Sequence, residues 1–115
     1  PARMPQYDDE VLAVRFFRTF VGSGEGDIFD LANLTLPRTY FGRSEIRSTS
    51  FENSDLHESN MCWNDFIDVG FVRADLSRSD MRASIYERVR FNHAILSFAD
   101  LRRTTFDDCD WSALS

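Results

Sequence analysis

Residues 54–78 read SDLHE SNMCW NDFID VGFVR ADLSR, and the third letter of every group of five is large and apolar. The same spacing runs unbroken from Leu36 to Trp111. The full set is Leu36, Phe41, Ile46, Phe51, Leu56, Met61, Phe66, Phe71, Leu76, Met81, Tyr86, Phe91, Leu96, Leu101, Phe106 and Trp111. Because 43% of the residues are apolar, an unbroken run of this length has a chance of about one in a million before the choice of phase. The five-residue period therefore decides the fold.

A five-residue step suits neither regular secondary structure. On an α-helix it advances by about 500°, which scatters the side chains around the whole surface. On a straight strand an odd step sends successive side chains to opposite faces. The remaining solution is a chain that bends after each short extended piece and returns every fifth side chain to a shared interior, as solenoid repeats do.

A second column of small residues supports this interpretation. Two positions before each large residue stand Thr39, Ser44, Thr49, Ser54, Ser59, Asn64, Val69, Ala74, Ser79, Ser84, Val89, Ala94, Ala99, Thr104 and Cys109. Small side chains are expected where a narrow interior adjoins a bulky neighbour. Between the two columns, a turn-forming Asp or Asn recurs at Asp55, Asn60, Asp65, Asp75, Asp80, Asp100 and Asp110.

Segments such as Ala74-Asp75-Leu76 and Ala99-Asp100-Leu101 resemble the A(D/N)Lxx motif of the pentapeptide-repeat family. The resemblance covers about two thirds of the chain. It implies a right-handed, quadrilateral, parallel β-helix with four pentapeptides per coil, so that residues twenty apart stack. The interior then sorts into four ladders, which are Leu36, Leu56, Leu76 and Leu96; Phe41, Met61, Met81 and Leu101; Ile46, Phe66, Tyr86 and Phe106; and Phe51, Phe71, Phe91 and Trp111. Tyr86 departs from the apolar pattern, and we expect its hydroxyl to find a partner or reach solvent.

The first thirty residues differ from the rest. Acidic residues 8–10 precede a segment, Val11 to Val21, whose apolar residues fall on one helical face, and glycines follow it. We expect a capping α-helix there, because Arg15 and Arg18 do not alternate as a strand requires. In the rival interpretation, Phe16 and Val21 share the repeat phase and belong to an irregular first coil. The expected organisation is all-β, with residues 1–30 as a lead and capping helix and residues 31–115 as a β-helix of about four coils.

Composition narrows the class of partner. The net charge of −6 and the lack of lysine argue against direct binding of nucleic acid or an anionic membrane. No apolar run is long enough to span a bilayer, and no basic, apolar leader opens the chain. We expect a bacterial-type, cytoplasmic protein. The last coil ends at Ser115 without an evident cap, so we expect missing residues or a second copy of the chain, forming a homodimer, to cover it.

No reaction is indicated by the residues. Cys62 is expected outside and Cys109 inside, so the two cannot form a disulfide. His57 and His93 fall in different outward columns without companions at metal-ligand spacing, and no Ser-His-Asp set or nucleotide loop occurs. We therefore expect no enzyme activity, no cofactor and no metal.

The outer columns carry the candidate partner-binding residues. On the third side, Glu45, Asp65, Asp68, Glu87, Asp107 and Asp108 stand against Arg47 and Arg88, a net charge of −4. On the second side, Arg43, Arg82, Arg102 and Arg103 stand against Asp80 and Asp100, a net charge of +2. Trp63 stacks on the column of Arg43 and Arg103 and is our first choice for a contact. The candidate set is Trp63, Arg43, Arg103, Asp65, Asp68, Glu87, Asp107 and Asp108.

Two functions fit these features. The first is a non-enzymatic scaffold that docks a protein partner, of unknown identity, on an outer face. The second follows from the resemblance, because quinolone-resistance members of the family act on DNA gyrase as mimics of duplex DNA. Four coils span about 19 Å, over which B-DNA carries about 11 charges. Residues 31–115 hold 13 acidic residues and 10 arginines, a net charge of −3. The charge therefore favours the scaffold.

Overall fold

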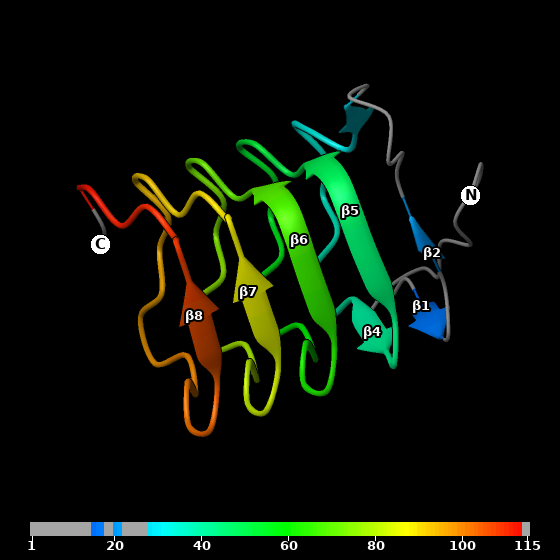
Figure 1. Cartoon of the computed structure of the whole chain (residues 1–115). Coiled ribbons are helices and arrows are strands. Elements are labelled where there is room, and N and C mark those ends of the chain that lie inside the picture. The colour runs from blue at the N-terminus through cyan, green and yellow to red at the C-terminus, as the bar shows by residue number, and fades with distance from the viewer. Residues whose placement is uncertain (1–14, 18–19, 22–27, 114–115) are drawn as a thin grey trace.

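A computed structural model of the chain describes residues 15–17, 20–21 and 28–113, with side chains from residue 28 onward. All regular elements of this part are strands, and every pair is parallel. They are β1 (Arg15–Phe17), β2 (Phe20–Val21), β3 (Phe29–Asp30), β4 (Tyr40–Gly42), β5 (Glu45–Ser50), β6 (Asp65–Gly70), β7 (Ile85–Glu87) and β8 (Thr105–Asp107). Figure 1 shows β5, β6, β7 and β8 side by side along a parallel β-solenoid of about four turns. No helix among these residues is long and apolar enough to cross a membrane.

The coils repeat every twenty residues. Ile46 pairs with Phe66, Phe66 with Tyr86, and Tyr86 with Phe106. Isolated bridges keep the same step on the other sides, from Asp55 to Asp75 and from Asp80 to Asp100 among others. Four pentapeptides therefore make one coil, and the expected ladders of residues twenty apart are confirmed.

The large residue of each pentapeptide points into the solenoid. These residues are buried from Leu36 to Phe91, most of them completely. Leu96, Phe106 and Trp111 are half-buried, and Leu101 is exposed, because no described coil stacks on the last turn. The core is thus a continuous column that is sealed along its length and open at its last described turn.

Aromatic rings fill two neighbouring sides of this core. Phe51, Phe71, Phe91 and Trp111 stack with centroids 5.3, 5.6 and 4.5 Å apart. The other ladder stacks Phe66, Tyr86 and Phe106 with centroids 4.9 and 5.3 Å apart. The ladders also touch each other edge to face, as between Tyr86 and Phe91. Stacking along the axis and edge contacts across it are the arrangements that aromatic quadrupoles favour.

The hydroxyl of Tyr86 contradicts the expectation drawn from the sequence. Tyr86 is completely buried, and its Oη has no hydrogen-bond partner. Burial raises the pKa of this phenol well above its ordinary value, because the phenolate would lose its hydration. The ring follows Phe66 and Phe106 so closely that its hydroxyl is fixed inside the core.

Small polar residues of the second column replace missing backbone pairs. Ser79 Oγ accepts the N–H of Ser59 at 3.1 Å and donates to the carbonyl of Leu56 at 3.2 Å. Ser84 repeats the pattern with the N–H of Asn64 at 2.9 Å and the carbonyl of Met61. The inward Ser, Thr and Asn residues therefore satisfy buried backbone groups in the preceding coil, which explains polar residues in an interior column.

The Asp or Asn between the columns shapes the turn that follows it. The carboxylate of Asp75 accepts the N–H of Ser77 at 3.0 Å, and that of Asp100 accepts the N–H of Arg102 at 3.1 Å. The next residue of each turn then has a positive φ, at every fifth position from Asn33 to Ala113. The sequence analysis did not identify these left-handed corners. Its available signal was that this column holds no β-branched residue, the type least tolerant of positive φ.

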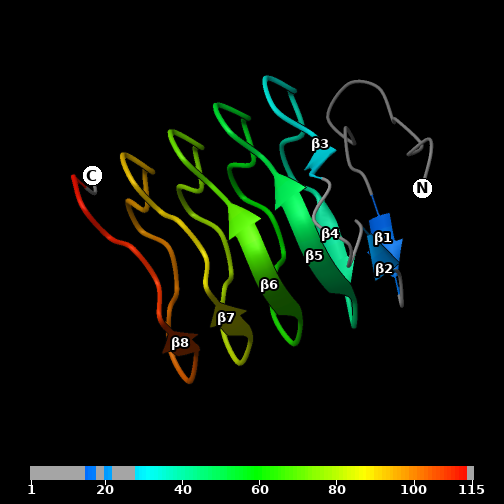
Figure 2. The same cartoon turned by 45° about the horizontal axis from the view of Figure 1, so that its top comes forward.

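The capping helix expected from Val11 to Val21 is wrong where the structure describes it. Residues 15–17 and 20–21 form strands β1 and β2, which pair with β4 and β5 at one end of the stack (Figure 2). Phe16 pairs with Phe41 and Val21 with Ile46, because both keep the repeat phase, as the rival interpretation required. The other residues of this segment, 11–14 and 18–19, lie outside the described part of the chain, as do residues 1–10.

This first coil is longer than the others. Phe16 and Phe41 are twenty-five residues apart, whereas Phe29 and Thr49, paired between β3 and β5, are twenty apart. The additional five residues enter the chain between Val21 and Phe29. An insertion of one whole pentapeptide leaves every side chain in its own column.

Candidate functional site

Trp63 lies on the outside of the second side, in the column of left-handed corners formed by Arg43, Trp63, Ala83 and Arg103, which we call the corner column. Its side chain is 69% exposed, and its backbone has a φ of 63°. Its N–H donates to the carbonyl of Arg82 in the next coil at 3.2 Å. The position is therefore held by the coil, and only the indole is free to contact another molecule.

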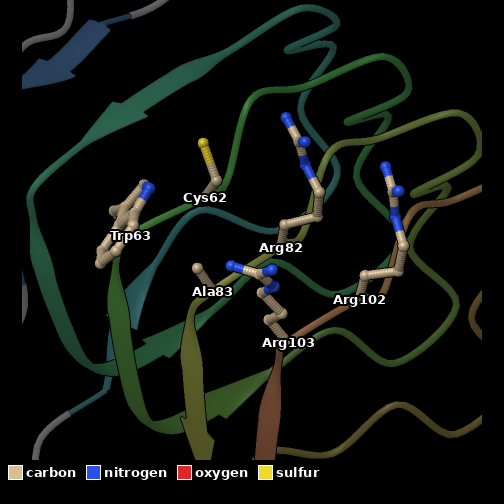
Figure 3. Close-up of a pocket in the computed structure, with 6 residues that line it drawn as sticks. All are labelled: Cys62, Trp63, Arg82, Ala83, Arg102 and Arg103. Atoms are coloured by element: carbon tan, nitrogen blue, oxygen red, sulfur yellow. The ribbon is translucent and has the colours of Figure 1, made fainter.

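A shallow depression of about 400 Å³ lies beside Trp63. Figure 3 shows the residues that line it, which are Cys62, Trp63, Arg82, Ala83, Arg102 and Arg103. They come from two adjacent columns on consecutive coils. Ala83 stands between Trp63 and Arg103 in the corner column, and its short side chain leaves the space open. The twenty-residue step, applied to the sequence, was the signal that places Ala83 there.

The structure brings two of the three second-side candidates into this depression. Trp63 and Arg103 line it, whereas Arg43 occupies the same corner column one coil earlier and does not. Arg82 and Arg102, which the sequence analysis counted only as charges, also line it. They were missed as site residues because nothing in the sequence distinguishes them from other exposed arginines.

Two of the three lining arginines are held in an ion-pair chain. Arg82 contacts Asp80 at 2.7 Å and Asp100 at 3.7 Å, and Arg102 contacts Asp100 at 2.6 Å. The Arg102 guanidinium holds the pKa of Asp100 at about 2, and Arg82 lowers the pKa of Asp80. Arg103 makes no ion pair with any residue that the structure describes. It is the uncompensated cation of the depression.

The thiol of Cys62 lines the depression and is not activated as a nucleophile. Its Sγ lies 3.0 Å from Oδ1 of Asn60, and burial raises the pKa of the thiol. Both Cys62 and Cys109 are free cysteines, as the sequence analysis expected. The depression therefore offers recognition groups and no activated nucleophile.

The acidic candidates lie on the side of β6, β7 and β8. Asp65 and Asp68 belong to β6, Glu87 ends β7, and Asp107 ends β8, with Asp108 next to it. Arg88 binds both carboxylate oxygens of Asp68, at 2.7 and 3.0 Å, and contacts Glu87 at 2.6 Å. This arginine lowers the pKa of Asp68. None of these acidic residues lines the depression beside Trp63.

His57 is not without companions, contrary to the sequence analysis. Ligand atoms of Asp55, His57 and Asp75 all lie within 4.8 Å of one another. His57 Nδ1 is 2.5 Å from Oδ1 of Asp55, and the coil register brings Asp75 onto Asp55. The sequence did contain the signal, because residues twenty apart stack on consecutive coils and Asp75 is twenty residues after Asp55. The Asp55 oxygen and the ring nitrogen are hydrogen-bonded to each other.

Together, the coil and its outer columns define a class of protein, a rigid parallel β-solenoid that presents its distinguishing chemistry on outward turns. Residues 44–82 match the family model of pentapeptide repeats, in eight copies. This stretch therefore consists of pentapeptide repeats. No curated protein sequence matches it.

Solved structures share the fold at low sequence identity. One is QnrB1, a plasmid-mediated fluoroquinolone resistance protein, with a TM-score of 0.56, 12% identity, and coverage of 89% of this chain and 55% of QnrB1. Another is HetL, a pentapeptide-repeat protein involved in heterocyst differentiation regulation in the cyanobacterium Nostoc sp. strain PCC 7120. It has a TM-score of 0.51, 16% identity, and coverage of 87% of this chain and 46% of HetL. The chain thus spans about half the length of each, and the likeness shows the fold alone.

Proposed function

We propose that this chain is a non-enzymatic scaffold that docks a protein partner on the face centred on Trp63. The observation that carries the proposal is an indole that is 69% exposed on a corner fixed by hydrogen bonds between coils. Tryptophan and arginine are enriched among residues that dominate binding energy at protein interfaces. A rigid scaffold also loses little conformational entropy when it binds.

The charged sides supply orientation. Arg43 and Arg103 share the corner column of Trp63, and the acidic residues Asp65, Asp68, Glu87, Asp107 and Asp108 occupy the next side. Opposite charges on adjacent faces steer a partner of complementary charge and fix its angle of approach. In this proposal Trp63 supplies affinity, and the charges set the encounter.

The test compares two exposed aromatic corners. Tagged wild-type protein, Trp63→Ala and Phe98→Ala are used to capture partners from a cytoplasmic extract. Phe98 is the matched control because it is also aromatic, exposed and left-handed in backbone conformation, but lies in another column. We expect a partner that Trp63→Ala loses and Phe98→Ala retains, with binding then measured on the purified pair. A partner retained by both variants, or lost by both, would contradict docking at Trp63.

The family resemblance suggests modulation of DNA gyrase as the alternative. The acidic side favours it locally, but Arg88 compensates Asp68 and Glu87 in the middle of that side. A duplex mimic needs an uninterrupted row of negative charge. A supercoiling assay with purified gyrase separates the functions, since inhibition or protection at micromolar protein would favour the gyrase role.

A second copy of the chain, docked on the last coil, stays a prediction. The half-buried side chains of Phe106 and Trp111 provide its apolar surface. The mass of the protein in solution, measured by light scattering across a range of concentrations, decides it. A monomer at all concentrations would contradict the dimer and leave docking at Trp63 untouched.

A further inference from the structure

The open space beside Trp63 results from one small residue. In the corner column, Trp63 and Arg103 are two coils apart, and Ala83 is the residue between them. Figure 3 shows the guanidinium of Arg103 turned back toward Ala83, while Arg82 and Arg102 run parallel in the neighbouring column. The hollow is thus bounded by an indole on one side and by guanidinium groups on the other.

The charges of this hollow are not balanced. Asp80 and Asp100 hold Arg82 and Arg102 in place, with contacts of 2.7 and 2.6 Å. The third guanidinium that lines the hollow belongs to Arg103, and it pairs with no carboxylate among the described residues. A guanidinium presents a planar pair of N–H donors that matches a carboxylate, and such charge-assisted hydrogen bonds are among the strongest in proteins.

From this arrangement we infer that the hollow binds the carboxylate of a Glu or Asp in an extended acidic segment of the protein partner. A neighbouring apolar side chain of that segment packs on the indole of Trp63. The inference rests on the proposed docking function and names the chemistry of the occupant. The volume of about 400 Å³ suits one or two side chains. Longer polyanions are disfavoured, because the adjacent side carries the acids of β6, β7 and β8.

The binding test uses a defined probe. It is an end-capped peptide of four glutamates around one phenylalanine, titrated into isotopically labelled protein by NMR. The matched control peptide has glutamine in place of glutamate. We expect the indole N–H of Trp63 and the Nε–H of Arg103 to shift with the glutamate peptide and not with the glutamine peptide. Equal shifts with both peptides, or no shift at millimolar peptide, would overturn the inference.

Three variants locate the contact. Arg103→Ala should weaken binding by about tenfold to a hundredfold, the loss expected for one charge-assisted hydrogen bond. Ala83→Phe should abolish binding without changing charge, because it fills the hollow. Phe98 shows that phenylalanine is compatible with the backbone conformation of a corner, and circular dichroism of the variant checks that it is folded. Arg73→Ala is the control, as Arg73 is an exposed corner arginine on another side. An effect of Arg73→Ala equal to that of Arg103→Ala would reduce the site to general charge attraction and overturn the inference.

Two further experiments distinguish a peptide carboxylate from other anions, and failure of this inference from failure of the proposed docking function. Inorganic phosphate or a short DNA duplex that displaces the peptide from Trp63 with equal or better affinity would overturn the commitment to a peptide carboxylate. If a partner depends on Trp63 but the glutamate peptide does not compete with it, only this inference fails. If the peptide binds as expected and no partner depends on Trp63, the proposed docking function fails instead.

Discussion

Tyr86 lies flat on Phe66, with ring centroids 4.9 Å apart and planes 2° apart, although only one of the two rings carries a hydroxyl. The match shows that stacking between coils, rather than the hydroxyl, determines where Tyr86 sits. The Oη consequently remains buried without a partner. A buried donor without an acceptor destabilises the native state, and several tests follow from it and from the coil geometry.

Tyr86→Phe should stabilise the protein. The substitution keeps the stacking on Phe66 and Phe106 and removes an unpartnered hydroxyl, whose burial costs about 1 to 3 kcal/mol. Urea unfolding followed by circular dichroism measures the change in the free energy of unfolding. Phe66→Tyr is the mirror control in the same ladder and should destabilise. A less stable Tyr86→Phe would show that the hydroxyl has a stabilising partner.

Alkaline pH should destabilise the wild-type protein more than Tyr86→Phe. The folded state raises the pKa of Tyr86, so above about pH 10 the unfolded chain ionises this phenol while the folded chain keeps its proton. The contribution is therefore intact below pH 10 and is lost as the pH rises further. Urea midpoints between pH 8 and pH 11 test this, and the other tyrosines are common to both proteins. Parallel curves for the two proteins would contradict the buried state of Tyr86.

Ser84→Ala should destabilise by about 1 to 3 kcal/mol. The Ser84 hydroxyl serves two buried backbone groups of the preceding coil, the N–H of Asn64 and the carbonyl of Met61, and alanine leaves both unpaired. The control is Ser97→Ala, because Ser97 is exposed, and it should change the free energy of unfolding by less than about 0.5 kcal/mol. Equal effects of the two substitutions would argue against the role of inward serines in joining the coils.

At the positive-φ corners, glycine should be more stabilising than valine, the reverse of the order at other exposed positions. At Arg73, where φ is 60°, valine should be less stable than glycine by about 1 to 2 kcal/mol, because a β-branched side chain clashes in the left-handed region. At Ser97, which is exposed but lies outside the set of positive-φ positions, valine should be at least as stable as glycine. Thermal unfolding of the four variants tests this, and the same order at both sites would count against corner strain.

Prediction from the sequence succeeded wherever the five-residue period acts directly. The register of Ile46 on Phe66, the burial of Phe71 and the outward place of Trp63 all follow from stacking at twenty residues, because one interior fixes both phase and direction. The period also carried the information that Asp75 meets Asp55 near His57. That juxtaposition was missed because the companions of His57 were sought at metal-ligand spacing along the sequence, and the twenty-residue step was not applied to them.

Other features needed three-dimensional information. The segment from Val11 to Val21 has an apolar face as a helix and an in-phase residue as a coil, and local pattern cannot decide between them. Pairing of Phe16 with Phe41 decided it, since parallel pairing satisfies backbone groups along that edge. The orientation of Arg103 toward Ala83 is a side-chain conformation, and the spacing of residues in the sequence does not encode it.

The pairing of Phe16 with Phe41 across an extra five residues has an evolutionary consequence. The solenoid keeps its interior when its sequence gains a whole pentapeptide, because every apolar side chain then still points inward. A gain of one or two residues would instead turn the following apolar side chains toward solvent. Gene duplication or slippage in units of fifteen nucleotides is then nearly silent for folding. Such steps give the lineage a way to extend its outer surface and acquire new contacts while the tube inside stays the same.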